Sequence, residues 1–299
     1  MDSVFQESCE SISTFEISIY TGCQISVFDI PVLKKANRMR KMILLALAIC
    51  IISKSNAYNI VSDATCYEIV DNSKNTVRLI ECWYEGEHFT IPEQVIWQDT
   101  AYQVVSISNL AFKRCTYLKT IEIPTTVKSI AVSAFNYCSK LEQILVSESN
   151  PIYCDADGVL YSADRQTLLH FPRAKKATSF HIPDNVSNIG AYAFFKCDGL
   201  EKVDLPPALT QVGIGAFNGC HHLKSVVFPH HLESIGDFAF YDCPNLLEVK
   251  LSSMHFISFQ ANTFCYQTLK EGRLTLPSDI SPNVLNQYKQ LGFANVAAE

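Results

Sequence analysis

One short phrase, Ala-Phe-x-x-Cys, recurs five times in this 299-residue chain. The copies begin at Ala111, Ala134, Ala193, Ala216 and Ala239. The first two copies are 23 residues apart, and so are the third and fourth and the fourth and fifth. A fixed period in this range is typical of stacked repeats rather than of a single wrapped core.

Each repeat contains one short strand followed by a turn. The units read Cys-x-x-Leu-x-x-Ile-x-Ile-Pro-x-x-Val-x-x-Ile-x-x-x-Ala-Phe, as in the copy from Cys115 to Phe135. Alternating apolar residues predict a strand with one face inward, and the proline ends it because it has no N–H to donate. One unit alone buries too little apolar surface to fold. We therefore expect a β-rich solenoid in which equivalent side chains, such as those of Phe194, Phe217 and Phe240, stack in file.

These motifs resemble the BspA-like leucine-rich repeats of bacterial cell-surface proteins. The resemblance covers roughly residues 60–299 and rests on the Leu-x-x-Ile-x-Ile-Pro strand, the Val-x-x-Ile-Gly turn and Ala-Phe-x-x-Cys. It implies a right-handed coil of ~23-residue leucine-rich repeats and a role in adhesion to host matrix or to other cells. The turn glycine is present at Gly190, Gly213 and Gly236, but Ala131 replaces it in an earlier copy, where we expect a different turn.

The repeats are predicted to span residues 111–278, with a long variant repeat at 147–183. There the polar residues 162–166 separate two apolar runs, which predicts a hairpin. Residues 58–110 are interpreted as the first repeat and an N-terminal cap built on a hairpin of residues 66–70 and 77–82. Residues 279–299 are interpreted as a C-terminal capping helix and tail, because Ser281 and Pro282 suit a helix start.

The N-terminal part has the pattern of a secretory leader. Basic residues at 34–41 precede the apolar run 42–52, and small residues at Ser55 and Ala57 suit a cleavage site. We expect a signal peptide at 39–57, preceded by an extension at 1–38 that is either disordered or an over-extended reading of the gene. An uncleaved anchor and lipidation at Cys50 are weaker alternatives. The prediction is a secreted or cell-surface protein without a membrane span in its mature chain.

Sequence motifs give no indication of an enzyme, a cofactor or a metal site. Nucleophile, zinc-protease, phosphate-loop and dinucleotide patterns are absent from the sequence. The pairs His221-His222 and His230-His231 flank a strand too long for them to share an ion. Asp155-x-Asp157-Gly158 is interpreted as a turn rather than a calcium loop, because glycine and glutamate are missing at the positions that the loop needs. A net charge of −6 without a basic stripe argues against nucleic acid as a partner.

Cysteines fall into two groups. Those of the repeat phrase are expected to be buried thiols inside the solenoid. Cys66 and Cys82 would face each other if the N-terminal hairpin centres on Lys74, which makes them the candidate disulfide.

Residues between the inward positions of each strand point outward and should align into columns on one face. This candidate binding face consists of Thr120, Glu122, Gln143, Leu145, Ser179, His181, Lys202, Asp204, Ser225, Val227, Glu248 and Lys250. Its mixed charges and the apolar Leu145 and Val227 suit a protein ligand. Two other functions stay open: an enzyme or carbohydrate-processing factor that uses the long variant repeat, and a structural envelope protein. The oligomeric state is not predicted.

Overall fold

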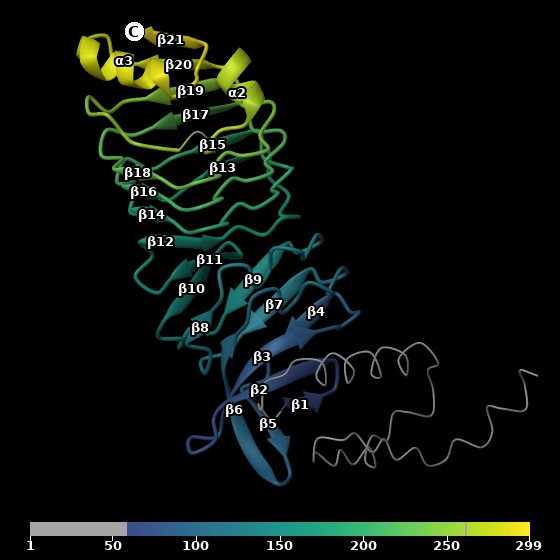
Figure 1. The fold of residues 1–299 in the computed structure, drawn as a ribbon. Coiled ribbons are helices and arrows are strands. Elements are labelled where there is room, and N and C mark those ends of the chain that lie inside the picture. The colour runs from purple at the N-terminus through teal and green to yellow at the C-terminus, as the bar shows by residue number, and fades with distance from the viewer. Residues whose placement is uncertain (1–58, 261) are drawn as a thin grey trace, which may run out of the picture. The chain divides into compact units, whose positions relative to one another are not determined.

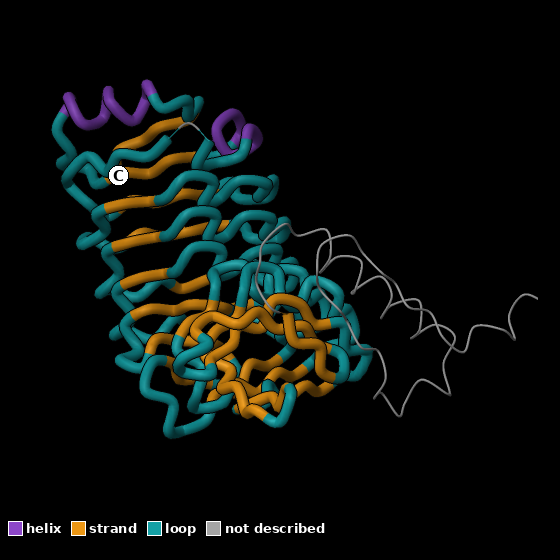
Figure 2. The backbone as a smooth tube through the Cα atoms, turned by 60° about the horizontal axis from the view of Figure 1, so that its bottom comes forward, coloured by secondary structure: helices purple, strands orange, loops and turns teal. Residues whose placement is uncertain are grey.

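A computed structural model describes residues 59–260 and 262–299, which form a solenoid of stacked coils (Figure 1). Viewed from another side, strands of successive coils lie one above the other and loops connect them (Figure 2). The predicted leader, the extension before it and Cys50 lie outside the described residues.

The first strand ladder is formed by the strands that the alternating apolar residues predict, with one further strand, β21, at its C-terminal end. Its strands are β4 (His88–Thr90), β7 (Thr120–Ile123) and β9 (Gln143–Val146), then β13 (Ser179–His181), β15 (Lys202–Asp204), β17 (Ser225–Phe228), β19 (Glu248–Leu251), β20 (Arg273–Leu276) and β21 (Asn295–Ala298). β4, β7 and β9 form one parallel sheet, and the other six strands of this ladder form another, in the order β13-β15-β17-β19-β20-β21. The ladder is thus interrupted between β9 and β13.

A second ladder lies at the Val-x-x-Ile-Gly turn of each coil. It consists of the two-residue strands β14 (Asn188–Ile189), β16 (Gln211–Val212) and β18 (Ser234–Ile235), which pair in parallel and continue from β12 (Thr167–His170). An equivalent strand, β8 (Ser129–Ile130), pairs with β6. The sequence predicted a turn here, and the structure shows that stacking converts this turn into a ladder.

The predicted N-terminal hairpin is present as β2 (Thr65–Asp71) and β3 (Thr76–Cys82), which pair antiparallel. It belongs to a larger sheet with β1 (Asn59–Ser62), β5 (Gln94–Trp97) and β6 (Thr100–Ile107), in the order β1-β2-β3-β6-β5. β3 pairs in parallel with β6, and β6 in turn with β8, so the sheet continues directly into the second ladder.

The long variant repeat contains the predicted hairpin and one more. β11 (Val159–Ser162) pairs antiparallel with β12 across the polar residues that suggested a turn. β10 (Tyr153–Ala156) pairs antiparallel with β11 through the two-residue turn Asp157-Gly158. Both turn residues have positive φ, 51° and 72°, as a type I′ hairpin turn requires. Asp157 and Gly158 therefore form a turn, as the sequence indicated.

Strand β11 divides the hydrophobic core in two. Val159 and Tyr161 pack in the C-terminal cluster with Phe194 and Phe217, whereas Leu160 packs in the N-terminal cluster with Phe112. This follows from the alternation of side chains along a strand. The variant repeat thus acts as a partition between an N-terminal segment (residues 59–146) and a C-terminal segment (residues 179–299, apart from 261).

Asn150 fixes the start of this partition. Its side-chain NH₂ donates to the carbonyls of Pro124 (2.7 Å) and Val127 (3.2 Å). Its Oδ1 accepts from the backbone N–H groups of Ile152 (2.9 Å) and Tyr153 (3.0 Å). The buried amide therefore joins the variant repeat to the preceding coil with its polar groups satisfied.

The predicted file of phenylalanines is confirmed. Ring centroids of Phe194 and Phe217 are 4.7 Å apart, those of Phe217 and Phe240 are 5.0 Å apart, and the planes differ by 10° and 9°. Phe171 and Phe264 extend the file at its two ends. Backbone bonds hold the coils in this register, since the N–H of Phe217 donates to the carbonyl of Ala239 at 2.7 Å.

The cysteine of the repeat phrase donates a hydrogen bond to the coil before it. The thiols of Cys220 and Cys243 donate to the carbonyls of Phe194 and Phe217, each at 3.1 Å. Burial raises the pKa of both thiols well above the ordinary value. A thiol held neutral in this way is a weak nucleophile, which fits the structural role expected for these residues.

The turn glycines are required by the close approach of consecutive coils. A Cβ on Gly213 would lie 2.6 Å from the backbone nitrogen of Ala191, and one on Gly236 would lie 2.6 Å from that of Ile214. Ala131 makes the same backbone hydrogen bond to the preceding coil as the glycines do. Its N–H donates to the carbonyl of Ile107 at 3.0 Å, and the N–H of Gly213 donates to the carbonyl of Ile189 at 2.8 Å.

The C-terminal end contains the predicted helix, α3 (Pro282–Gln290), which begins with Ser281 as N-cap. Tyr288 is fully buried, and its hydroxyl accepts from the N–H of Ile257 at 2.8 Å. A short helix, α2 (Tyr266–Glu271), precedes it. The final strand, β21, was not predicted: it follows the helix and pairs with β20.

Candidate binding face

Outward side chains of the first ladder form two columns in the C-terminal segment, as predicted. Column 1 contains residues that pair directly from strand to strand: Ser179, Lys202, Ser225 and Glu248. Column 2 contains the residues two positions further along each strand: His181, Asp204, Val227 and Lys250. Arg273 and Thr275 continue the two columns on β20.

The remaining predicted face residues form a separate run in the N-terminal segment. Thr120 pairs with Gln143, and Glu122 pairs with Leu145. The hydroxyl of Thr90 donates to Oε2 of Glu122 at 2.9 Å. Leu145 is half-buried rather than exposed, so it offers less apolar surface than the sequence suggested.

The variant repeat separates the two runs. The N–H of Ile144 donates to the carbonyl of Gly158 at 2.9 Å, and the N–H of Val146 donates to Oδ1 of Asp155 at 2.8 Å. The β10–β11 hairpin therefore occupies the edge of β9 where the next strand of the ladder would lie. Each of the two expected columns is therefore divided into two shorter ones, because an antiparallel hairpin replaces one parallel strand of the ladder.

Within the C-terminal run, β15 and β17 spread apart. They pair at one register position, Lys202 with Ser225, whereas β17 and β19 pair at four. A proline after the strand does not by itself end the pairing, since Pro229 follows β17 and that strand still pairs with β19 at four positions.

The spread leaves a hollow of about 290 Å³ on the face. We call it the β15–β17 hollow; its lining is Lys202, Val203, Asp204, Leu205, Pro207, Ser225, Val227 and Pro229. Val227 is 52% exposed there. Four predicted face residues, two from each column, thus meet around an apolar depression.

Charges around the hollow are arranged in opposite order in the two columns. Column 1 runs from Lys202 through the neutral Ser225 to Glu248, and column 2 runs from Asp204 through the neutral Val227 to Lys250. Within β15, Lys202 Nζ and Asp204 Oδ1 are 2.8 Å apart. The face therefore has local polarity but no dominant sign.

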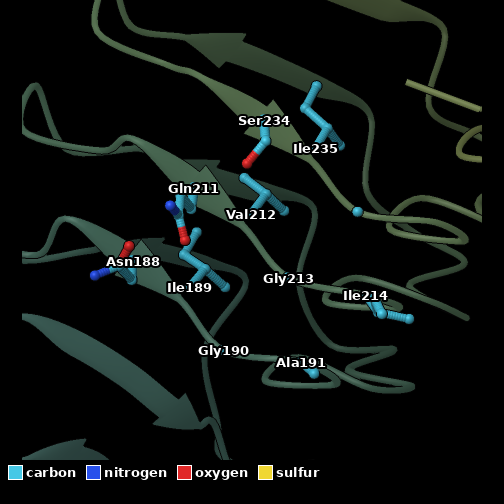
Figure 3. A pocket seen from close by; sticks show the side chains of 11 residues that line it. Asn188, Ile189, Gly190, Ala191, Gln211, Val212, Gly213, Ile214, Ser234 and Ile235 are labelled. Carbon is cyan, nitrogen blue, oxygen red and sulfur yellow. The ribbon is translucent and has the colours of Figure 1, made fainter. Parts of the chain in front are cut away.

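A second, neutral groove of about 380 Å³ lies along the second ladder (Figure 3). Asn188, Gln211 and Ser234 line it, and Gly190, Gly213 and Gly236 form the strip beside them. None of its eleven lining residues is charged. The glycines are explained by the contact between coils, so the groove gives no separate indication of a ligand.

His221 takes part in an ion-pair ladder across consecutive coils. Its Nδ1 lies 2.5 Å from Oδ1 of Asp198, and its Nε2 lies 3.1 Å from Oδ2 of Asp242. Arg173 completes the ladder on the other side of Asp198 at 3.2 Å. Burial lowers the pKa of His221, but the bonds and charges of the two carboxylates outweigh it and raise the pKa above its ordinary value.

The histidine pairs do not form a metal site in the described part of the chain. His222 Nδ1 contacts the backbone carbonyl of Asp198 at 2.8 Å, while His230 and His231 lie exposed in a turn. Among residues 59–260 and 262–299, no group of three or more His, Cys, Asp or Glu side chains is placed to hold a metal ion.

The register of the N-terminal hairpin differs from the one assumed for the candidate disulfide. Cys66 lies opposite Glu81, and Cys82 lies opposite Thr65, so the two cysteines are one position apart rather than face to face. One step along a strand turns a side chain to the other face. Cys82 instead contacts the next coil, where its carbonyl accepts from the thiol of Cys115 at 3.3 Å. The disulfide stays a prediction for non-reducing mass spectrometry.

Within residues 59–260 and 262–299, no helix has the length and apolar character needed to cross a bilayer.

Solved structures with a similar fold are leucine-rich repeat proteins. One from Eubacterium ventriosum is 18% identical with a TM-score of 0.51, over 82% of this chain and 85% of that chain. A leucine-rich cell surface protein from Faecalibacterium prausnitzii is 16% identical with a TM-score of 0.44, over 78% and 98%. One from Bacteroides ovatus is 22% identical with a TM-score of 0.44, over 81% and 67%.

A comparison with curated proteins gives no significant match. The family model described as "BspA type Leucine rich repeat region" matches six copies at residues 89–155 and 170–290. These residues make up more than half of the chain and include the stacked phenylalanines, the thiol-bonded cysteines and both runs of the candidate face. The protein therefore belongs to the BspA-type leucine-rich repeat family.

Proposed function

We propose that this protein is a secreted or cell-surface binding protein that engages a protein ligand through the first-ladder face of its C-terminal segment. The observation that carries the proposal is the register-aligned run from β13 to β20 with the exposed Val227 over the β15–β17 hollow. Extended faces of solenoids offer the contact area that protein recognition needs. The leader-like residues 34–57 support export, and adhesion to host matrix or to neighbouring cells is the role we infer.

The arrangement of the variant repeat favours binding over catalysis there. Its large side chains are used for packing, since Leu160, Tyr161 and Leu168 are each at most 2% exposed. Burial raises the pKa of Tyr161 to about 12, which keeps its hydroxyl neutral. The partition between the two cores accounts for the length of this repeat without a reaction.

The proposal is tested by binding of the purified chain to a panel of extracellular matrix proteins, measured by surface plasmon resonance. We expect saturable binding to at least one of them, weakened at least tenfold by Lys202→Glu. Glu122→Lys, in the other run, reports whether both runs take part. Glu233→Lys, at an exposed turn, is the matched charge-reversal control. No saturable binding, or binding that Lys202→Glu leaves unchanged, would contradict the proposal.

Localisation is tested separately by fractionation. Immunodetection in the medium and on intact cells, followed by N-terminal sequencing, should find a mature chain that begins after Ala57. Retention inside the cell with residues 39–57 intact would rule out export.

A further inference from the structure

The size of the β15–β17 hollow limits what can occupy it. Its volume of about 290 Å³ lies at the lower end of the range for small-molecule pockets. Leu205, Pro207, Val227 and Pro229 give it apolar walls, and its lining includes no aromatic ring. A branched aliphatic side chain suits these apolar walls better than a sugar, which is usually held against an aromatic face, and the hollow is small for a cofactor.

The charged residues on either side of Val227 in column 2 add a charge requirement. Asp204 precedes Val227 and Lys250 follows it, on strands β15, β17 and β19. Paired strands lie ~4.8 Å apart, and β15 and β17 are further apart than this beside the hollow, so the two charges are more than about 10 Å apart across the coils. A segment that crosses the coils along this column meets an anion, an apolar depression and a cation in order.

An extended polypeptide fits this spacing. Its side chains i, i+2 and i+4 point to one face and span about 13 Å, which suits two charges more than about 10 Å apart. Given the proposed function, on which this step rests, we infer that the β15–β17 hollow anchors an aliphatic side chain of an extended partner segment, with a cationic residue over Asp204 and an anionic residue over Lys250.

The inference is tested by selecting peptides from a phage-displayed library of random nine-residue sequences on the immobilised full chain. We expect enrichment of Val, Ile, Leu or Met at one position, with one basic and one acidic residue two positions away on either side. Because the segment can run in either direction, single charge reversals are the informative variants. Lys250→Glu should select two basic flanking residues, and Asp204→Lys should select two acidic ones.

Matched variants separate the hollow from the rest of the surface. Val227→Asp should weaken the best selected peptide by about ten- to a hundredfold, the loss expected for one aliphatic contact. Ile214→Asp is the control, since Ile214 is 51% exposed against 52% for Val227 but does not line the hollow. Glu248→Lys in column 1, at a residue that does not line the hollow, should leave the flanking charges of selected peptides unchanged.

Peptides without an aliphatic position, flanking charges that ignore Asp204 and Lys250, or equal loss in Val227→Asp and Ile214→Asp would overturn the inference. These outcomes are distinguishable from failure of the proposed function. A matrix protein that binds and responds to Lys202→Glu keeps the binding role intact even if the peptide pattern is absent.

Discussion

The two segments on either side of the variant repeat use the same phrase but stack it differently. In the C-terminal segment, Phe217, Phe240 and Phe264 follow one another with planes within 9° of parallel. In the N-terminal segment, the planes of Phe112 and Phe135 differ by 27°. The repeat phrase therefore places the phenylalanine ring inside the solenoid, while parallel stacking of the rings depends on the structure of the neighbouring coil.

The neighbours explain the difference. C-terminal coils rest on coils of the same kind, and Gly213 and Gly236 allow their backbones to approach closely. N-terminal coils continue a mixed sheet, in which β6 pairs antiparallel with β5 and in parallel with β8, and sheets twist from strand to strand. Regularity in this protein therefore increases away from the N-terminal sheet.

The largest effects should come from leucines on the two sides of the partition. Leu160 packs in the N-terminal core and Leu168 in the C-terminal core, and both are buried. Each Leu→Ala substitution should lower the free energy of unfolding by about 2–5 kcal/mol. Hydrogen exchange should show lost protection mainly before the partition for Leu160→Ala and mainly after it for Leu168→Ala. Loss spread evenly over both segments would mean that the cores unfold as one.

His170 should make the partition sensitive to acid. It contacts Phe135 with ring centroids 5.5 Å apart, and burial lowers its pKa to about 4. In the unfolded chain His170 binds a proton below about pH 6.5, whereas in the folded protein it stays neutral down to about pH 4. The free energy of unfolding is therefore unaffected by this group above about pH 6.5 and decreases as the pH falls toward 4. The loss should reach about 3 kcal/mol at pH 4. Urea midpoints at pH 4 and pH 7 measure it, and His170→Leu should flatten the difference.

The turn glycines sharpen the comparison between segments. Gly213→Ala should lower the free energy of unfolding by about 1–3 kcal/mol, because the new Cβ would meet the backbone of the preceding coil at 2.6 Å. Ala131→Gly, at the matching position of the N-terminal segment, should cost only about 0.5–1 kcal/mol through added backbone freedom. Equal costs in thermal unfolding would show that coil contacts at the two turns are alike.

The smallest effect should come from the surface ladder of His221. Its folded-state pKa is raised by Asp198 and Asp242, so its contribution is fully present below about pH 6.5 and is lost as pH rises through the folded value. Partial exposure limits the contribution to below about 1 kcal/mol. His221→Gln should therefore lower the melting temperature slightly at pH 5.5 and leave it unchanged at pH 8.5. An equal change at both pH values would assign His221 a packing role instead.

Features set by local pattern could be predicted. The 23-residue spacing gave the solenoid, and the alternation around each Ile-x-Ile gave the first-ladder strands and their outward columns. Ser281 and Pro282 marked the start of α3, and polar residues marked the turns of β2–β3 and β11–β12. Each of these depends on residues within one repeat, where periodicity and turn chemistry are sufficient.

Features set by contacts between repeats could not be predicted from the sequence. The division of the face by the β10–β11 hairpin, the register that separates Cys66 from Cys82, and the final strand β21 each depend on which edge is available to pair. The β15–β17 hollow depends on two neighbouring strands losing a bond. The sequence determined which side chains face inward, because alternation is local; the tertiary structure decided where the ladder breaks, because pairing is a property of two coils together.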